Sequence, residues 1–149
     1  MTANTQPRFF KAPNISFGGA VLGPSANTAL DGSGANTTSI WQADATEGGG
    51  VLKVILKPVG SPAATVARLF LCSVTGAFTA GTSNTAANCG MVAEMTLPAI
   101  TQTQTAAQPP FEIPVNIYVQ AGYRLLLTFG TSTGAAGTGY SVTTVGGDF

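Results

Sequence analysis

The stretch EIPVNIYVQAGYRLLLTF, residues 112–129, decides the fold class of this chain. Apolar residues alternate with other residues in its first half, and again in its second half after a short break that contains Gly122. The apolar positions that share one side are Ile113, Val115, Ile117 and Val119, then Leu125, Leu127 and Phe129. A period of two on both sides of a glycine-containing break predicts a β-hairpin with one buried face.

Further stretches of strand composition alternate with turns rich in glycine, proline and asparagine. They cover residues 15–22, 37–43, 51–59, 65–74, 90–97 and 138–145. With the hairpin they make about eight strands and no helix, which predicts a single all-β domain over residues 15–149. We expect an antiparallel β-sandwich that is jelly-roll-like. An immunoglobulin-type sandwich is the alternative, but Cys72 and Cys89 lie too close in sequence for the bridge that joins its two sheets.

The composition is poor in charge. Only 8% of the residues are charged and the net charge is zero, whereas about 25% are charged in an ordinary soluble domain. A hydrophobic content of 44% argues against disorder, and no apolar run is long enough to span a membrane as a helix. Without a basic patch, the chain has little attraction for nucleic acid. Two interpretations of this low charge are open. Threonine, serine and asparagine side chains alone could keep the surface soluble, or partners could cover much of it. We favour covering by partners, because the centres of protein interfaces are also poor in charge.

The segment 1–14 is predicted to be an extended arm, because Pro7 and Pro13 block regular pairing. It has no apolar run of signal-peptide length, so we expect synthesis in a cytoplasm. Two adjacent phenylalanines are costly in water, and the arm therefore either folds onto its own domain or reaches a neighbouring subunit. We favour the neighbour. The candidate partner interface is Arg8, Phe9, Phe10 and Lys11.

The two cysteines flank a long polar loop, residues 75–88, which is predicted to be a contact loop or a locally disordered segment. Cys72 ends one predicted strand and Cys89 begins the next, so the two thiols could face each other. A bridge there would stabilise the fold by roughly 3 kcal/mol. Because a cytoplasm is reducing, two free thiols are the default expectation and a disulfide is the alternative.

No arrangement of residues predicts catalysis or a cofactor. Histidine is absent, which removes the commonest general base and metal ligand. The carboxylates show no telling spacing, although Glu94 and Glu112 lie on predicted strands. The turn 31–34, DGSG, has only part of a calcium-loop pattern, and zinc needs more ligands than the chain offers. We therefore expect neither an enzyme nor a metal site.

The larger aromatic residues leave two interpretations open. They could form a platform on which sugar rings stack, or they could belong to the core and its rim, which we favour. These residues are Trp41, Tyr118, Tyr123 and Tyr140.

Short segments carry a family resemblance. They are ANTALDGSG at 26–34, the RLF core at 68–70, AGYRLLLTF at 121–129 and the terminal VGGDF at 145–149. With these segments the chain resembles small virion-associated proteins of tailed bacteriophages. The loops 75–88 and 130–137 are longer than expected for such proteins.

The resemblance implies a non-enzymatic capsid decoration or cement protein that binds the outside of the phage head. Its partner would be the major capsid protein, and it would be a homo-oligomer, with a trimer favoured. It would bind neither nucleic acid nor membrane, and it would be located on the virion surface after assembly in the bacterial cytoplasm. One alternative is a tail or head-fibre module that binds a host-surface glycan, and another is an oligomeric β scaffold outside any virus.

Overall fold

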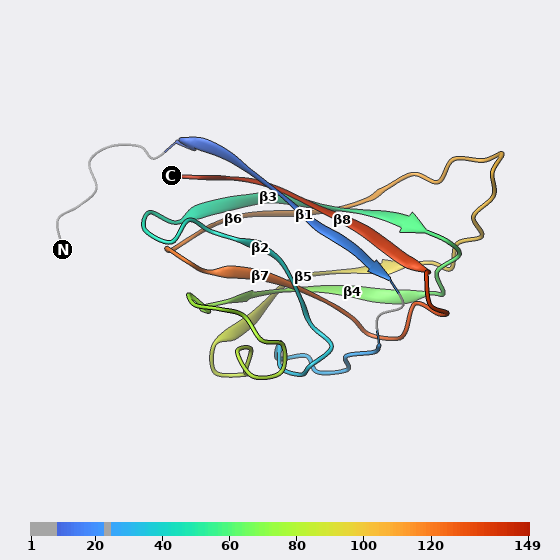
Figure 1. Cartoon of the computed structure of the whole chain (residues 1–149), viewed down its shortest axis with the longest axis horizontal. Helices are drawn as coiled ribbons and strands as arrows, with labels where there is room; N and C mark the ends of the chain where they lie inside the picture. The colour runs from blue at the N-terminus through green and yellow to red at the C-terminus, as the bar shows by residue number, and fades with distance from the viewer. Residues whose placement is uncertain (1–8, 23–24) are drawn as a thin grey trace.

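The computed structural model describes residues 9–22 and 25–149, and the regular elements within these ranges are all β-strands (Figure 1). The strands are β1 (Ala12–Leu22), β2 (Thr38–Gln42), β3 (Gly49–Val59), β4 (Thr65–Cys72), β5 (Cys89–Leu97), β6 (Phe111–Val119), β7 (Arg124–Phe129) and β8 (Gly139–Asp148). They form two antiparallel sheets of four strands each, a first sheet β1-β8-β3-β6 and a second sheet β2-β7-β4-β5. The predicted all-β class is confirmed.

The predicted hairpin over residues 112–129 is wrong in its pairing. β6 pairs with β3 in the first sheet, whereas β7 lies between β2 and β4 in the second. The turn that contains Gly122, with φ 74°, therefore carries the chain from one sheet to the other. Alternation reports which side of a strand is buried, but it holds no information on the strand's partner.

The core lies between the two sheets and contains the largest side chains. Trp41, on β2, and Tyr140, on β8, are both fully buried. The Tyr140 ring stacks on Phe129 at 5.6 Å between centroids and meets Phe111 edge-on at 6.4 Å. Because these rings come from both sheets, they hold the sheets together as a β-sandwich-like body.

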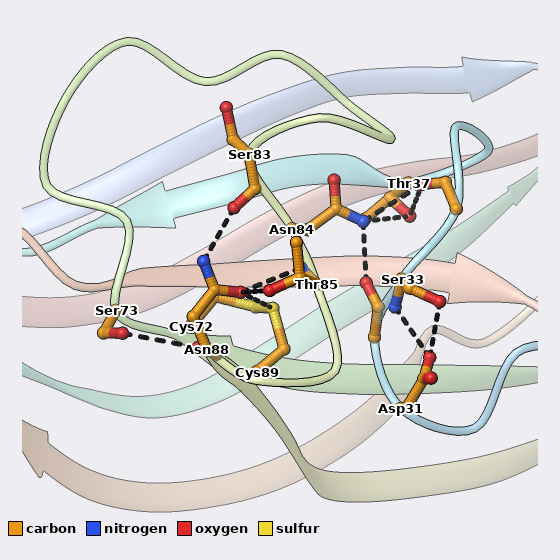
Figure 2. The surroundings of a disulfide bond; sticks show 12 residues. Asp31, Ser33, Thr37, Cys72, Ser73, Ser83, Asn84, Thr85, Asn88 and Cys89 are labelled. Carbon is orange, nitrogen blue, oxygen red and sulfur yellow. Dashed lines mark hydrogen bonds between the residues drawn. A yellow bond between two sulfur atoms is a disulfide. The ribbon is translucent and has the colours of Figure 1, made fainter.

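The chain's own loops, 25–37 and 73–88, cover the part of the second sheet's outer face around Phe70 and Leu126 (Figures 1 and 2). Met91 and Val92 of β5 stay exposed. A small apolar cluster forms beneath the second loop, with Phe70 and Leu126 fully buried. Asn84 anchors that loop, because its buried amide donates to the carbonyl oxygens of Gly32, at 2.7 Å, and Gly34, at 3.0 Å. The loop 75–88 is thus packed onto the domain.

The strands at the two ends of the chain are longer than predicted. β1 begins at Ala12 rather than at residue 15, and β8 continues to Asp148 through the predicted tail. Pro13 is tolerated because β1 is an edge strand that pairs only with β8. Part of the predicted arm and the terminal GGD are therefore paired with each other in the first sheet.

Candidate partner-binding surface

The first sheet carries a docking place for Phe10 on its outer face. The Phe10 ring lies over Gly147 of β8 and reaches Gly50 of β3. A Cβ atom added at Gly147 would lie 2.5 Å from the Phe10 ring, and one at Gly50 would lie 3.0 Å from it. These two glycines, which face each other across β8 and β3, let the ring approach the backbone closely.

Phe10 joins other aromatic residues at this end of the sheet. Its ring stacks on Phe149 with centroids 5.8 Å apart and is tilted against Tyr118 at 6.0 Å. Tyr118 and Phe149 also contact each other, at 5.9 Å. Phe9, Phe10, Tyr118 and Phe149 line one shallow hollow of about 110 Å³, and we call these four residues the aromatic patch. Phe9 is 78% exposed and Tyr118 is 68% exposed, so the patch presents much of its apolar surface to solvent.

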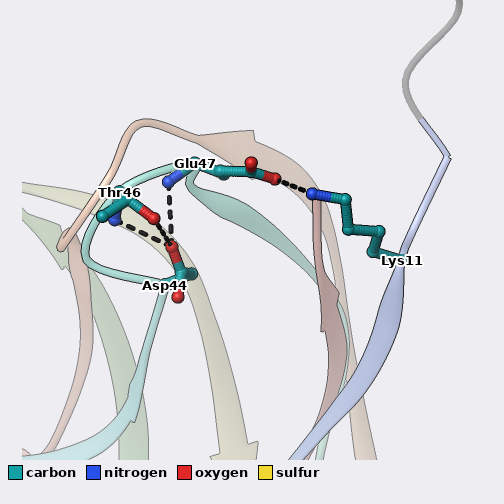
Figure 3. A network of polar contacts seen from close by, with 4 residues as sticks. All are labelled: Lys11, Asp44, Thr46 and Glu47. Carbon is teal, nitrogen blue, oxygen red and sulfur yellow. Dashed lines mark hydrogen bonds and ion pairs between the residues drawn. The ribbon is translucent and has the colours of Figure 1, made fainter.

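Lys11 is held beside the patch by a backbone hydrogen bond to Asp148 and by an ion pair with Glu47, which Figure 3 shows. The Lys11 ammonium lies 2.5 Å from the Glu47 carboxylate, and the Lys11 N–H donates to the Asp148 carbonyl at 2.7 Å. Both side chains of the ion pair are largely exposed, so the pair fixes geometry more than it stabilises the fold.

The turn that presents Glu47 is built by Asp44. One Asp44 carboxylate oxygen accepts hydrogen bonds from the Thr46 hydroxyl at 2.6 Å, the Thr46 N–H at 2.8 Å and the Glu47 N–H at 2.9 Å. The Thr46 hydroxyl, followed by the N–H groups of Glu47 and Thr46, lowers the pKa of Asp44 to about 2. The turn is therefore fixed by local bonds before any partner arrives.

Asp148 fixes the junction between the two chain ends from the opposite side of the sheet. Its carboxylate accepts from the Asn14 side-chain amide at 2.8 Å and from the Asp44 N–H at 3.2 Å. The Asn14 amide also donates to the Gln42 carbonyl of β2. The terminal GGDF is thus structural, since Gly147 admits the Phe10 ring, Asp148 ties β1 to β8 and Phe149 completes the aromatic patch.

Exposed apolar side chains continue along the same outer face. Phe17 is 78% exposed and Ile15 is also exposed, both on β1, and Leu52 on β3 adds a third. The face is edged by an ion pair between Lys53 and Glu112, 2.9 Å apart. We call Ile15, Phe17 and Leu52, together with the aromatic patch, the apolar face of the first sheet.

The predicted interface residues fall largely within this surface. Phe9, Phe10 and Lys11 lie together at one end of the first sheet and contact their own domain there, whereas Arg8 lies outside the described residues. That they bind a neighbour stays a prediction. Tyr118 and Phe149 were not predicted to belong to the site. The alternation of β6 did place Tyr118 on the outward side, which is the one sequence signal for it.

Cys72 and Cys89 are joined in a disulfide, so the default expectation of free thiols differs from the structure (Figure 2). The two residues are directly opposite in the β4–β5 register, with Cα atoms 4.1 Å apart. The disulfide closes the loop 73–88 on the outer side of the second sheet, so it lies away from the apolar face of the first sheet.

Two acidic side chains outside the apolar face, Asp31 and Glu94, are held by hydrogen bonds or an ion pair within the domain. Asp31 accepts from the Ser33 hydroxyl and N–H, which lower its pKa and close the DGSG turn. Glu94 forms an ion pair with Arg68 at 3.6 Å. Over residues 9–22 and 25–149, no three histidine, cysteine or acidic side chains gather where they could hold a metal ion. Nor does any helix in those ranges have the length and apolarity to cross a membrane.

The proposed sugar platform does not assemble. Trp41 and Tyr140 are in the core, and Tyr123 packs against it. Tyr118 alone of the four is well exposed.

The fold and the surface together define a small β-sandwich-like protein with an apolar outer face on its first sheet. The chain matches no protein-family model, no curated protein and no solved structure.

Proposed function

We propose that this chain is a non-enzymatic structural protein of a virus, a capsid decoration protein that binds the outside of a tailed-phage head and stabilises contacts between capsid subunits. The observation that carries the proposal is the apolar face of the first sheet. Large exposed apolar areas on a small protein mark sites of interaction. The low charge of the whole chain supports the same conclusion, since the centres of protein interfaces are depleted in charge.

The strand pairing supports a jelly roll as the finer description of the fold. β1 pairs with β8, β2 with β7, β3 with β6 and β4 with β5. This nested order is that of one long hairpin folded over into two packed sheets. Jelly rolls of eight strands are used in viral capsid proteins and also in lectins.

Binding would work by burial of apolar surface, without chemistry. Covering one Phe side chain contributes about 1.5–3 kcal/mol, and the apolar face offers Phe9, Phe17 and Tyr118 in partly exposed positions. A homo-oligomer, with a trimer favoured, would engage several subunits of the major capsid protein at once, and such multivalence adds affinity without new contacts. Cohesion between capsid subunits would follow from this bridging.

The test compares one exposed residue on each side of the molecule. Phe17→Ser removes an apolar side chain from the apolar face, and Leu30→Ser is the matched control, since Leu30 is 63% exposed on a loop that covers the second sheet. We expect the Phe17→Ser protein to bind heads that lack the protein at least about tenfold more weakly in co-sedimentation, because about 1.4 kcal/mol corresponds to a factor of ten. Leu30→Ser should bind normally. Equal binding by both variants would contradict the proposal, as would immunogold labelling confined to tails.

A host-glycan-binding module is the second candidate, and one observation favours it. Beside the aromatic patch, Tyr118 and Phe149 also border a wider hollow of about 410 Å³ that Thr46, Glu47 and Gln120 line with polar groups. A sugar ring could stack on Tyr118 while its hydroxyl groups bond these side chains. This function predicts saturable binding to host polysaccharide that Tyr118→Ala abolishes. Binding that survives this substitution would exclude the hollow as the sugar site.

A further inference from the structure

Phe10 and Lys11 occupy a receptor that is built entirely from parts of the chain beyond β1. The receptor consists of Glu47, Gly50, Tyr118, Gly147 and Phe149, with the Asp148 carbonyl as hydrogen-bond acceptor. Its shape is set by β3, β6, β8 and the turn that Asp44 builds. The receptor therefore does not depend on which copy of the chain supplies the segment that fills it.

The backbone of residues 9–11 joins its own domain through the start of β1. Pro13 lies opposite Gly147 there and has no N–H to donate, so the chain can leave the sheet at this point without losing a hydrogen bond from that residue. The next residue, Asn14, is fixed by its bonds to Asp148 and to the Gln42 carbonyl. Residues 9–13 can thus change direction while the rest of β1 stays in place.

We propose that residues 9–11 are exchanged between copies of this chain, so that the receptor of one copy is filled by Phe10 and Lys11 of a second copy. The exchange preserves the ring contacts of Phe10, the ion pair of Lys11 with Glu47 and the Lys11 hydrogen bond to Asp148. It also places two bodies side by side at the apolar face. Phe9, which is 78% exposed when the segment folds back on its own domain, then lies between them. Exchange of an identical element is a low-cost route to oligomers.

Concentration decides between the two arrangements. A segment tethered to its own receptor has an effective concentration on the order of millimolar, so folding back prevails in dilute solution. Exchange prevails when copies are crowded. The inference concerns contacts between copies of this chain and does not depend on a capsid being the partner.

The experiment links two different chains across the exchanged contact. One chain carries Lys11→Cys and the other carries Glu47→Cys, while Cys72 and Cys89 are held in their disulfide and do not react. The two are mixed from about 10 µM to about 1 mM, around the effective concentration of the tethered segment, and treated with a short bis-maleimide. Peptide mass spectrometry identifies links between position 11 of one chain and position 47 of the other. The matched control replaces Lys11→Cys with Lys57→Cys, an exposed lysine at the far end of β3.

We expect linked heterodimer that increases with concentration and exceeds the Lys57→Cys control at least about tenfold in the upper range, where exchange becomes comparable with folding back. Adding Phe10→Ser to the Lys11→Cys chain should reduce the link to the control level. A single chain with both Lys11→Cys and Glu47→Cys should link within itself when dilute. If it does so, and the mixed chains give no more heterodimer than the control pair at any concentration, exchange is refuted. Because no particle is present, this result is independent of binding to phage heads.

Discussion

Removal of the Cys72–Cys89 disulfide should destabilise the protein by an amount that depends on the length of the loop it closes. The bond closes a loop with a sequence separation of 17 residues. In the chain-entropy model a loop of this size restricts the unfolded chain by about 3 kcal/mol. Alanine is the suitable replacement at both positions, because Cys72 is fully buried in the cluster around Phe70 and a serine hydroxyl would lack a partner there.

The expected loss of about 3 kcal/mol is a sizeable fraction of the free energy of unfolding of such a domain. A typical domain is stable by about 5–15 kcal/mol, so the double variant should still fold. For a chain of this length we expect its melting temperature to fall by about 10 °C. The single tryptophan, Trp41, is buried in the core and reports unfolding by its fluorescence.

The assay is urea unfolding of three samples, the oxidised protein, the same protein with a reducing agent and the double alanine variant. The reduced protein and the variant should both lose about 3 kcal/mol relative to the oxidised protein. A loss below about 0.5 kcal/mol in both would refute the reasoning, because it would mean that the hydrogen bonds of the loop already close it in the unfolded ensemble.

Three further perturbations test other parts of the structure. Asn84→Ala removes the amide that satisfies two loop carbonyls and should destabilise the fold by about 2–4 kcal/mol in urea unfolding. Asp44 has a pKa lowered from 3.8 to about 2, so the stability it contributes is present above pH 3.8 and is lost as the pH falls through about 2. The urea midpoint of the Asp44→Asn variant should therefore change less between pH 3.8 and about 2 than that of the unchanged protein. Gly147→Ala places a Cβ 2.5 Å from the Phe10 ring, so it should displace the segment and speed tryptic cleavage after Lys11.

Each of these has its own contrary result, and Gly147→Ala has a matched control. Gly90→Ala, where an added Cβ meets nothing within 4 Å, should leave cleavage after Lys11 unchanged. Equal cleavage rates for the two alanine variants would contradict the docking of Phe10. An unchanged pH profile in Asp44→Asn would remove the turn's contribution to acid sensitivity. An Asn84→Ala protein of normal stability would show that the loop is held by other contacts.

Much of the fold could be predicted from the sequence, because alternation is a local signal. The strand around Ile113 and Val119 has its buried and exposed sides as predicted. The pairing of that strand could not be predicted, since its partner β3 lies far along the chain and nothing in residues 112–129 specifies it. β7 was predicted to bury one face only, yet both faces are buried, because a loop around Asn84 covers the second.

The candidate site could be predicted in part for the same reason. Phe9 and Phe10 beside basic residues and prolines are a local signal, and these residues do gather on one surface. Phe149 joins them because β8 pairs with β1 and β3, and Tyr118 joins them because β6 pairs with β3. These pairings link parts of the chain that are far apart in sequence. The disulfide could be predicted only as an alternative, because a reducing cytoplasm favours free thiols even where two cysteines lie at facing strand ends.

The two outer faces of this protein are treated in opposite ways, and the contrast bears on function. Both sheets place large apolar side chains outward, Phe70 and Leu126 on the second and Ile15 and Phe17 on the first. On the second sheet a long loop, closed by a disulfide and anchored by a buried amide, covers them. No described segment covers Ile15 and Phe17 in that way, although covering them would stabilise the isolated chain by several kcal/mol, at about 1.5–3 kcal/mol for each side chain. A chain that covers Phe70 and Leu126 on one face and leaves Ile15 and Phe17 exposed on the other is best explained if a partner covers the exposed face.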